Sequence, residues 1–216
     1  MLFRDRAEAG RFLSRKLLEA VPELRNEPAT VLAIPRGGVP VAAPIATALH
    51  APLDVFIARK LGAPGREELA IGAVAADGTR VIDRELVHLL RVSESYIEKI
   101  TAREIAEAQR RLALFRGTRP PPPLRDRAVI LVDDGLATGA TASAALRVLL
   151  AERPLRLIFA APVASAEGAE LVGSRGVTTV FSAIPKHFQG VGEWYEQFEQ
   201  TSDEEVLSLL AAVNAR

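Results

Sequence analysis

The chain has 216 residues, a length that suits one α/β domain with a small appendage. Its 27 basic residues balance its 27 acidic residues, and this balance argues against nucleic acid as the main partner, because nucleic-acid binders usually carry a basic excess. The sequence contains no cysteine, which excludes disulfides, thiolate nucleophiles and metal sites built on cysteine.

The apolar runs are far shorter than the ~20 residues that a membrane helix needs. The first twelve residues are charged and periodic, and so differ from the apolar core of a signal peptide. We therefore expect a cytoplasmic protein with no membrane partner. Only four of the basic residues are lysines, and this arginine bias suits a heat-stable protein and a GC-rich genome equally well.

Hydrophobic periodicity divides the chain into helices and strands. In chain order it predicts a helix over 5–21, a strand over 30–34, a helix over 40–50, strands over 53–58, 70–75 and 80–82, a helix over 92–116, a strand over 128–132, a helix over 141–152, a strand over 155–161, a helix over 166–172, a strand over 178–182 and one or two short helices over 193–213. Strands that alternate with helices at this spacing imply βαβ units, and hence an α/β fold with an open, mainly parallel sheet covered by helices on both faces.

Local signals mark the ends of several of these elements. Two pairs of residues, Ser95 with Glu98 and Ser202 with Glu205, form capping boxes that predict helix starts. Asp77-Gly78 predicts a hairpin turn between two short strands. Four prolines at 120–123 predict an extended connector, because they stop any helix.

The segment Val129–Thr141, VILVDDGLATGAT, carries the chemistry. A buried strand ends in two carboxylates, and a loop of small residues then leads directly into a helix. In an open α/β sheet ligands bind at the carboxyl ends of the strands, where this loop falls. Small side chains from 135 to 140 let backbone N–H groups converge on an anion, and the following helix adds unpaired donors and its positive dipole end. With the hydroxyls of Thr138 and Thr141, the loop suits a phosphate monoester.

Asp133 and Asp134 lie directly before this loop. Two carboxylates beside a phosphate site would repel the phosphate unless something separates the charges. A ribose does so, because its hydroxyls donate to the acids while its 5′-phosphate occupies the loop. Taken alone, the two acids and Gly135 are equally compatible with a polar turn that ends a strand.

The segment is neither a Walker A loop nor a Rossmann fingerprint, because no Gly-Lys-Ser/Thr follows and Gly-x-Gly-x-x-Gly is absent. Over thirteen continuous residues it resembles the 5-phosphoribosyl-1-pyrophosphate (PRPP) motif of type I phosphoribosyltransferases. The resemblance implies that Asp133 and Asp134 bind the ribose hydroxyls and act in catalysis. It implies that the 5′-phosphate is bound by Gly135, Ala137, Thr138, Gly139, Ala140 and Thr141.

Two further segments fit the same resemblance. In the family, the loop that matches Arg36, Gly37 and Gly38 binds pyrophosphate, often through an unusual cis peptide. By themselves the two glycines fit a plain strand-to-helix turn better, and the main motif is what favours the binding role. Arg59 and Lys60 precede a glycine-rich, charged stretch in a region where the family carries a flexible catalytic loop, so both are candidates to neutralise the leaving group. Arg66 fits a solvated charge cluster better.

Aromatic residues gather near the C-terminus, and the family uses a small, variable hood there to hold the acceptor. Phe188, Trp194 and Tyr195 are the candidates for stacking on it, although packing of the hood against the core explains them equally well. His187 suits a structural role better than a catalytic one. The predicted organisation is a core over 1–182, with a flexible loop at about 59–80 and a proline-rich connector over 117–126, followed by a hood and helical tail over 183–216.

The resemblance implies a PRPP-dependent pentosyltransferase that moves the 5-phosphoribosyl group to a nitrogenous base and releases pyrophosphate. Mg²⁺ is the expected cofactor, and because the chain offers few magnesium ligands, PRPP itself would mainly hold the ion. The residues name neither the base nor a general acid or base. A PRPP-sensing regulatory protein on the same fold is the alternative, a PRPP synthetase a more distant one, and the family's habit of dimerising suggests a homodimer.

Overall fold

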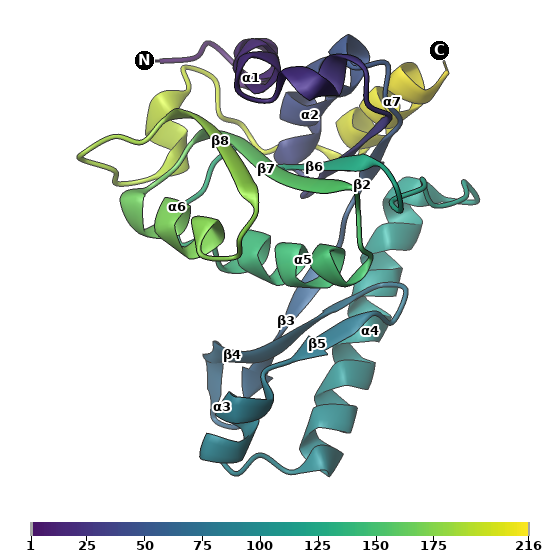
Figure 1. Cartoon of the computed structure of the whole chain (residues 1–216), viewed down its shortest axis with the longest axis vertical. Helices are drawn as coiled ribbons and strands as arrows, with labels where there is room; N and C mark the ends of the chain where they lie inside the picture. The colour runs from purple at the N-terminus through teal and green to yellow at the C-terminus, as the bar shows by residue number, and fades with distance from the viewer. Residues whose placement is uncertain (1, 216) are drawn as a thin grey trace.

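The computed structural model describes residues 2–215, with their side chains except that of residue 68 (Figure 1). Its centre is a five-stranded parallel sheet in the order β2-β1-β6-β7-β8. The strands are β1 (Ala29–Ala33), β2 (Leu53–Val55), β6 (Ala128–Val132), β7 (Arg156–Val163) and β8 (Thr178–Ala183). Ala33 pairs with Val132 and Val132 with Ala160, so these strands end side by side and their following loops meet at one edge.

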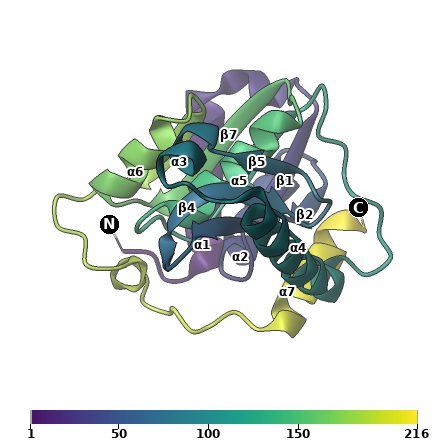
Figure 2. The same ribbon diagram turned by 90° about the horizontal axis from the view of Figure 1, so that it is seen from below.

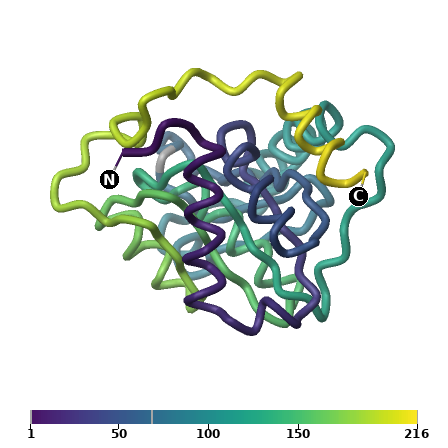
Figure 3. The backbone as a smooth tube through the Cα atoms, turned by 90° about the horizontal axis from the view of Figure 1, so that it is seen from above, coloured from purple at the N-terminus to yellow at the C-terminus, as the bar shows by residue number. Residues whose placement is uncertain are grey.

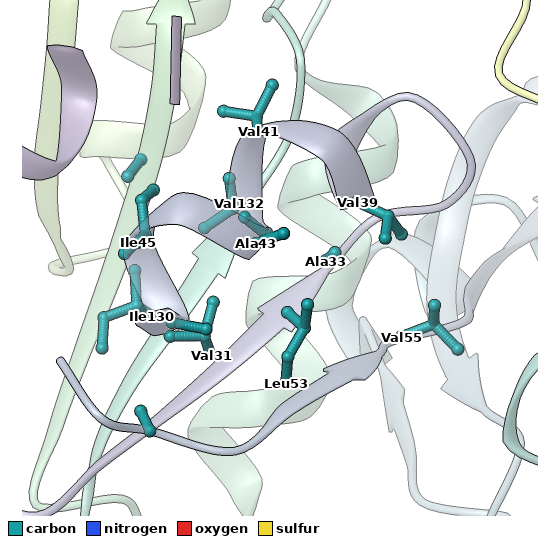
Figure 4. Close-up of a cluster of buried hydrophobic side chains, with 14 of the residues drawn as sticks. Val31, Ala33, Val39, Val41, Ala43, Ile45, Leu53, Val55, Ile130 and Val132 are labelled. Atoms are coloured by element: carbon teal, nitrogen blue, oxygen red, sulfur yellow. The ribbon is translucent and has the colours of Figure 1, made fainter. Parts of the chain in front are cut away.

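Helices cover both faces of the sheet, as Figure 1 shows. On one face lie α1 (Arg6–Ala20), α2 (Gly38–Ala48) and α7 (Asp203–Asn214), and on the other lie α5 (Ala140–Ala151) and α6 (Ala166–Gly173). Alternate residues of the central strands enter the two cores, which explains why β1 and β6 are continuously buried and almost entirely apolar. In Figure 4 side chains from β1, β2 and β6 meet those of α2, and each buried Val, Leu or Ile contributes roughly 1.5–3 kcal/mol.

Residues 58–116 leave this sheet and form a unit that projects from the domain in Figure 1 and is seen end-on in Figure 2, and which we call the arm. It consists of β3 (Ala58–Ala63), β4 (Arg66–Ala75), β5 (Arg80–Ile82), α3 (Arg84–Leu89) and α4 (Glu94–Arg116). The three strands form an antiparallel sheet whose own core includes Leu61, Ile71 and Ile97. Small residues of β4, Ala73 and Ala75, pack against α5 and fasten the arm to the central domain.

In the arm and directly before it, the structure differs from the sequence-based expectation in three places. Residues 59–80, expected as a loop, lie mostly in β3 and β4, and their mobility stays a prediction. The strand expected over 53–58 ends at Val55, because the chain then crosses into the arm's sheet. The N-cap of α4 is Ser93 and not Ser95, since the Ser93 hydroxyl accepts the N–H of Tyr96. The predicted turn is confirmed: Gly78 has φ +91° between β4 and β5.

The C-terminal segment runs around the domain before α7 begins, as Figure 3 shows. It contains the short 3₁₀ helix η2 (Val191–Trp194), and a similar turn, η1 (Pro22–Arg25), follows α1. The helix start predicted at Ser202 is confirmed, because the Ser202 hydroxyl accepts the N–H of Glu205 at 3.1 Å and α7 starts at Asp203. Val206 and Leu210 of α7 are buried in the core above the sheet. Within residues 2–215, every helix is too short or too polar to cross a bilayer.

Candidate functional site

A cavity of about 930 Å³ lies where the carboxyl ends of β1, β2 and β6 meet the arm and the start of α7. It brings together the three segments that the sequence singled out. Their lining residues are Arg36, Gly37, Arg59, Lys60, Asp133, Asp134, Thr138, Ala140 and Thr141. Residues that the sequence did not predict also line it, namely Phe56, Arg110, Arg111, Leu114, Phe115, Gln200 and Asp203.

The loop between β1 and α2 lies directly against the end of β6. The N–H of Ile34 donates to the carbonyl of Val132 at 2.8 Å, and the N–H of Gly38 donates to the carbonyl of Ile34 at 3.0 Å. A Cβ on Gly38 would lie 2.7 Å from the Val132 oxygen, so only glycine permits this approach. The peptide bond between Pro35 and Arg36 is cis, the feature that the family resemblance implied for this loop.

The loop between β6 and α5 is held in shape by the neighbouring strand and helix. The N–H of Leu136 donates to Val163 at 2.9 Å, and the N–H of Ser165 donates to Leu136 at 2.8 Å. Gly139 precedes α5 with φ +73°, a conformation that residues with a side chain rarely adopt. The loop is therefore anchored at both ends before any ligand binds.

The same loop offers donors to an anion. Among residues 2–215, no hydrogen-bond acceptor pairs with the backbone N–H groups of Ala137, Thr138 or Gly139. Thr138 and Thr141 line the cavity with their hydroxyl-bearing side chains, and α5 starts there with its positive dipole end. These donors suit the oxygens of a phosphate.

The two acids after β6 are in different surroundings. Burial, and then the charge of Asp134, raises the pKa of Asp133 well above its ordinary value. Asp134 is paired with Arg6 of α1, whose Nε lies 2.8 Å from Asp134 Oδ2. The hydroxyl of Tyr195 donates to the Asp134 carbonyl at 2.6 Å, and burial raises the pKa of this phenol. Asp133 therefore faces the cavity beside a carboxylate that is paired with Arg6.

Four arginines of the cavity are paired with carboxylates, two of them with carboxylates from other elements. Arg36 lies 3.3 Å from Asp203 at the start of α7, and Arg59 lies 2.8 Å from the buried Glu104 of α4. Both Arg110 and Arg111 bind Glu107 of their own helix, and these hydrogen bonds lower the pKa of that partly exposed carboxyl to about 2. The arginines are thus oriented before a ligand arrives.

The three aromatic residues of the expected hood do not line the cavity. Tyr195 is buried and stacks on Phe198 at 5.1 Å between ring centroids, and Trp194 belongs to the same aromatic cluster. Phe188 is partly exposed. From this segment it is Gln200 and Asp203 that reach the cavity instead, and no local sequence signal distinguishes them from other surface residues.

The sequence pattern of the phosphoribosyl transferase domain family matches residues 4–199. The chain belongs to the type I phosphoribosyltransferase family. Two curated proteins from two strains of Mycobacterium tuberculosis, provisionally named phosphoribosyl transferases, are each 40% identical to it over 209 residues. The match covers 97% of this chain and 46% of theirs, so the chain spans about half the length of the curated relatives it matches.

A solved structure matches almost the whole fold. The crystal structure of the protein TT1426 from Thermus thermophilus is 40% identical, covers 98% of this chain and 99% of its own, and superposes with a TM-score of 0.89. Family membership confirms the resemblance seen in the sequence, and the five parallel strands between two helical layers confirm the predicted fold class.

Proposed function

We propose that the chain transfers the 5-phosphoribosyl group from PRPP to a nitrogenous base and releases pyrophosphate. The observation that carries the proposal is that three features meet at one cavity. They are the loop over residues 135–141, which we call the phosphate-type loop, the adjacent acids Asp133 and Asp134, and the loop with the cis Pro35–Arg36 peptide. Membership of the phosphoribosyltransferase family supports a glycosyltransferase-type enzyme. The identity of PRPP as donor and the class of acceptor are parts of the proposal.

The donor would lie across the carboxyl edge of the sheet. Its 5′-phosphate would bind the loop that ends at Thr141, with the N–H groups of 137–139 as donors. Gly135, which has no side chain, would let the backbone of this loop approach the donor closely. The ribose hydroxyls would donate to Asp133 and Asp134. Pyrophosphate would bind Arg36, Gly37 and Gly38, and Arg59 and Lys60 would approach it from β3, since both line the same cavity.

The reaction breaks the bond between C1′ and the pyrophosphate oxygen, whose electron pair leaves with pyrophosphate. A ring nitrogen of the base forms the new bond to C1′ and then loses its proton to solvent. If departure runs ahead of attack, positive charge develops on the ribose ring. The Asp133 carboxylate, beside an Asp134 that is paired with Arg6, would lower the energy of that charge, and the arginines of the cavity would stabilise the leaving group.

Mg²⁺ is the cofactor that the family implies, and the donor chemistry of the site fits an ion that arrives with its substrate. Among residues 2–215 there is no group of three or more His, Cys, Asp or Glu side chains that could hold a metal by itself. Asp133 and Asp134 supply hard oxygen atoms beside the place proposed for the ribose hydroxyls. When bound, the ion would neutralise charge on the pyrophosphate.

The acceptor is a nitrogenous base of unassigned identity. Aromatic surface at the cavity comes from Phe56, which could contact a planar ring, whereas Phe115 is buried in the core. Phe188, Trp194 and Tyr195 remain proposals from the sequence and would need a rearrangement of the C-terminal segment to reach it.

The experiment is to measure pyrophosphate release from PRPP and Mg²⁺ with a panel of purine, pyrimidine and pyridine bases. Release with one base above the blank without base is expected, and would establish the transferase and name its acceptor. Arg59→Gln should lower this release, whereas Arg103→Gln, which removes the other arginine bound to Glu104 but not a cavity residue, serves as the matched control. If no base gives pyrophosphate release above the blank although the protein binds PRPP, the PRPP-sensing alternative would be favoured.

A further inference from the structure

We infer that Arg6 is a positioning residue of the pyrophosphate site, where it neutralises the Asp134 carboxylate and holds it against the loop at Gly37. This inference rests on the proposed function, because it assigns the pyrophosphate of PRPP to that loop. Arg6 belongs to none of the motifs seen in the sequence, and it lies 128 residues from its partner.

The Arg6 side chain is fixed on several sides. Its Nε donates to Asp134 Oδ2 at 2.8 Å, and its Nη1 donates to the carbonyl of Glu199 at 2.8 Å. The guanidinium lies 4.0 Å from the centroid of the Phe198 ring, a cation–π contact. The side chain is only 11% exposed, so it is part of the interior beside the site rather than a solvated surface charge.

The carboxylate that Arg6 holds lies directly against the loop proposed for pyrophosphate. A Cβ on Gly37 would lie 2.0 Å from Asp134 Oδ2, which shows how closely the carboxylate approaches this loop. An uncompensated charge there would repel an incoming polyanion, and the effect is strong because the Asp134 side chain is only 17% exposed. Arg6 turns this carboxylate into one half of an ion pair.

The position of Arg6 in its own helix argues against a purely local role. Arg6 is the first residue of α1, after the N-cap Asp5, and a cation is disfavoured at a helix N-terminus by the helix dipole. The Asp134 carboxylate offsets that cost.

Backbone hydrogen bonds also fix the segment that leads into Arg6. The N–H of Phe3 donates to Trp194 at 2.9 Å, and the N–H groups of Glu196 and Gln197 donate to Phe3 and Arg4 at 2.8 and 2.9 Å. The N-terminal segment is thereby fastened to the segment that supplies Phe198 and Glu199.

The test compares ligands that do and do not reach the loop. Isothermal titration calorimetry with Mg²⁺ would measure binding of pyrophosphate, PRPP and ribose 5-phosphate to the wild type, Arg6→Gln and Arg4→Gln. Arg4 is the matched control, because its side chain is 57% exposed and forms an ion pair with the neighbouring Asp5. We expect Arg6→Gln to weaken pyrophosphate and PRPP binding about tenfold or more, to weaken ribose 5-phosphate binding less than threefold, and Arg4→Gln to change none of them.

An equal loss for all three ligands would show that Arg6 is merely structural, and unchanged affinities would show that it has no role; either result overturns the inference. A wild type that binds neither PRPP nor pyrophosphate would instead remove the proposed function, and this inference with it. A wild type that binds both, together with an Arg6→Gln variant that binds both with unchanged affinity, overturns the inference alone.

Two further variants keep the test decisive if Arg6→Gln does not fold, as judged by circular dichroism. Arg6→Lys keeps the positive charge beside Asp134 but not the fork of donors, so its loss of pyrophosphate affinity should be smaller than about tenfold. Asp134→Asn removes the charge that Arg6 neutralises, so pyrophosphate should bind at least as tightly as to the wild type. A tenfold loss of pyrophosphate affinity in Asp134→Asn would contradict the electrostatic role.

Discussion

The hydroxyl of Ser165 donates a 2.6 Å hydrogen bond to the carbonyl of Ala137 and accepts one of 2.8 Å from the N–H of Gly168. One side chain therefore caps α6 and holds the phosphate-type loop. Gly168 completes the contact, because a Cβ there would lie 2.5 Å from the Ala137 oxygen. The geometry of the loop thus depends on a helix that follows the next strand of the sheet.

Ser165→Ala should lower both stability and phosphate affinity. Loss of the N-cap costs about 1 kcal/mol, and the freed loop should bind ribose 5-phosphate several-fold more weakly. Ser202→Ala removes the N-cap of α7 and is the matched control, since it loses a cap of the same kind away from the loop. Thermal unfolding and calorimetric titration of both variants check this; equal phosphate affinity in the two would show that Ser165 does not shape the loop.

Gly139→Val should abolish the phosphate site. The residue has φ +73°, and a Cβ there would lie 3.2 Å from the carbonyl of Gly168, so strain of about 1–2 kcal/mol adds to steric bulk. Gly176→Val imposes a similar strain at φ +70° in open space and should leave ribose 5-phosphate binding intact. Undiminished affinity in Gly139→Val, measured beside this control, would contradict the assignment of the loop.

Asp203→Asn should strengthen pyrophosphate binding. The change releases Arg36 from an ion pair of 3.3 Å and removes a negative charge from the cavity wall. Pairs this exposed contribute about 0.2–1 kcal/mol, which corresponds to a gain of up to about fivefold in affinity. Glu204→Gln alters the next carboxylate of α7, outside the cavity, and should change nothing in a titration with Mg²⁺ and pyrophosphate. Weaker binding in Asp203→Asn would mean that Asp203 supports the site instead.

Asp133→Asn should stabilise the fold at neutral pH while it lowers turnover about 100-fold or more. Folding raises the pKa of Asp133, so between the unfolded pKa of about 3.9 and the raised folded value the folded state binds more protons. The residue therefore destabilises the fold increasingly as the pH rises through that window, and asparagine removes the effect.

The measurement is the melting temperature of Asp133→Asn and the wild type at pH 3.5 and pH 7. The difference in favour of the variant should be larger at pH 7. Asp126→Asn, on the exposed connector before β6, should match the wild type at both values. A variant that is less stable than the wild type at pH 7 would mean that the Asp133 carboxylate is stabilised in the fold.

The strand, acids and loop of Val129–Thr141 could be read from the sequence, because this chemistry lies in one continuous segment whose order follows from strand and helix periodicity. The alternation of elements likewise predicted the parallel sheet and the edge where β1 and β6 end. Helix starts were less certain where capping residues compete, as Ser93 and Ser95 do at α4.

Tertiary structure alone decided which distant charges meet. Arg6 and Asp134, Arg36 and Asp203, and Arg59 and Glu104 are joined only when separate elements pack, and no local pattern records their pairing. The packing of Tyr195 behind Asp134 was likewise decided by the tertiary structure. The sequence does not distinguish an aromatic residue that stacks on a ligand from one that fills a core. Short-range periodicity thus determined the elements and the phosphate loop, whereas long-range packing determined the electrostatics around that loop.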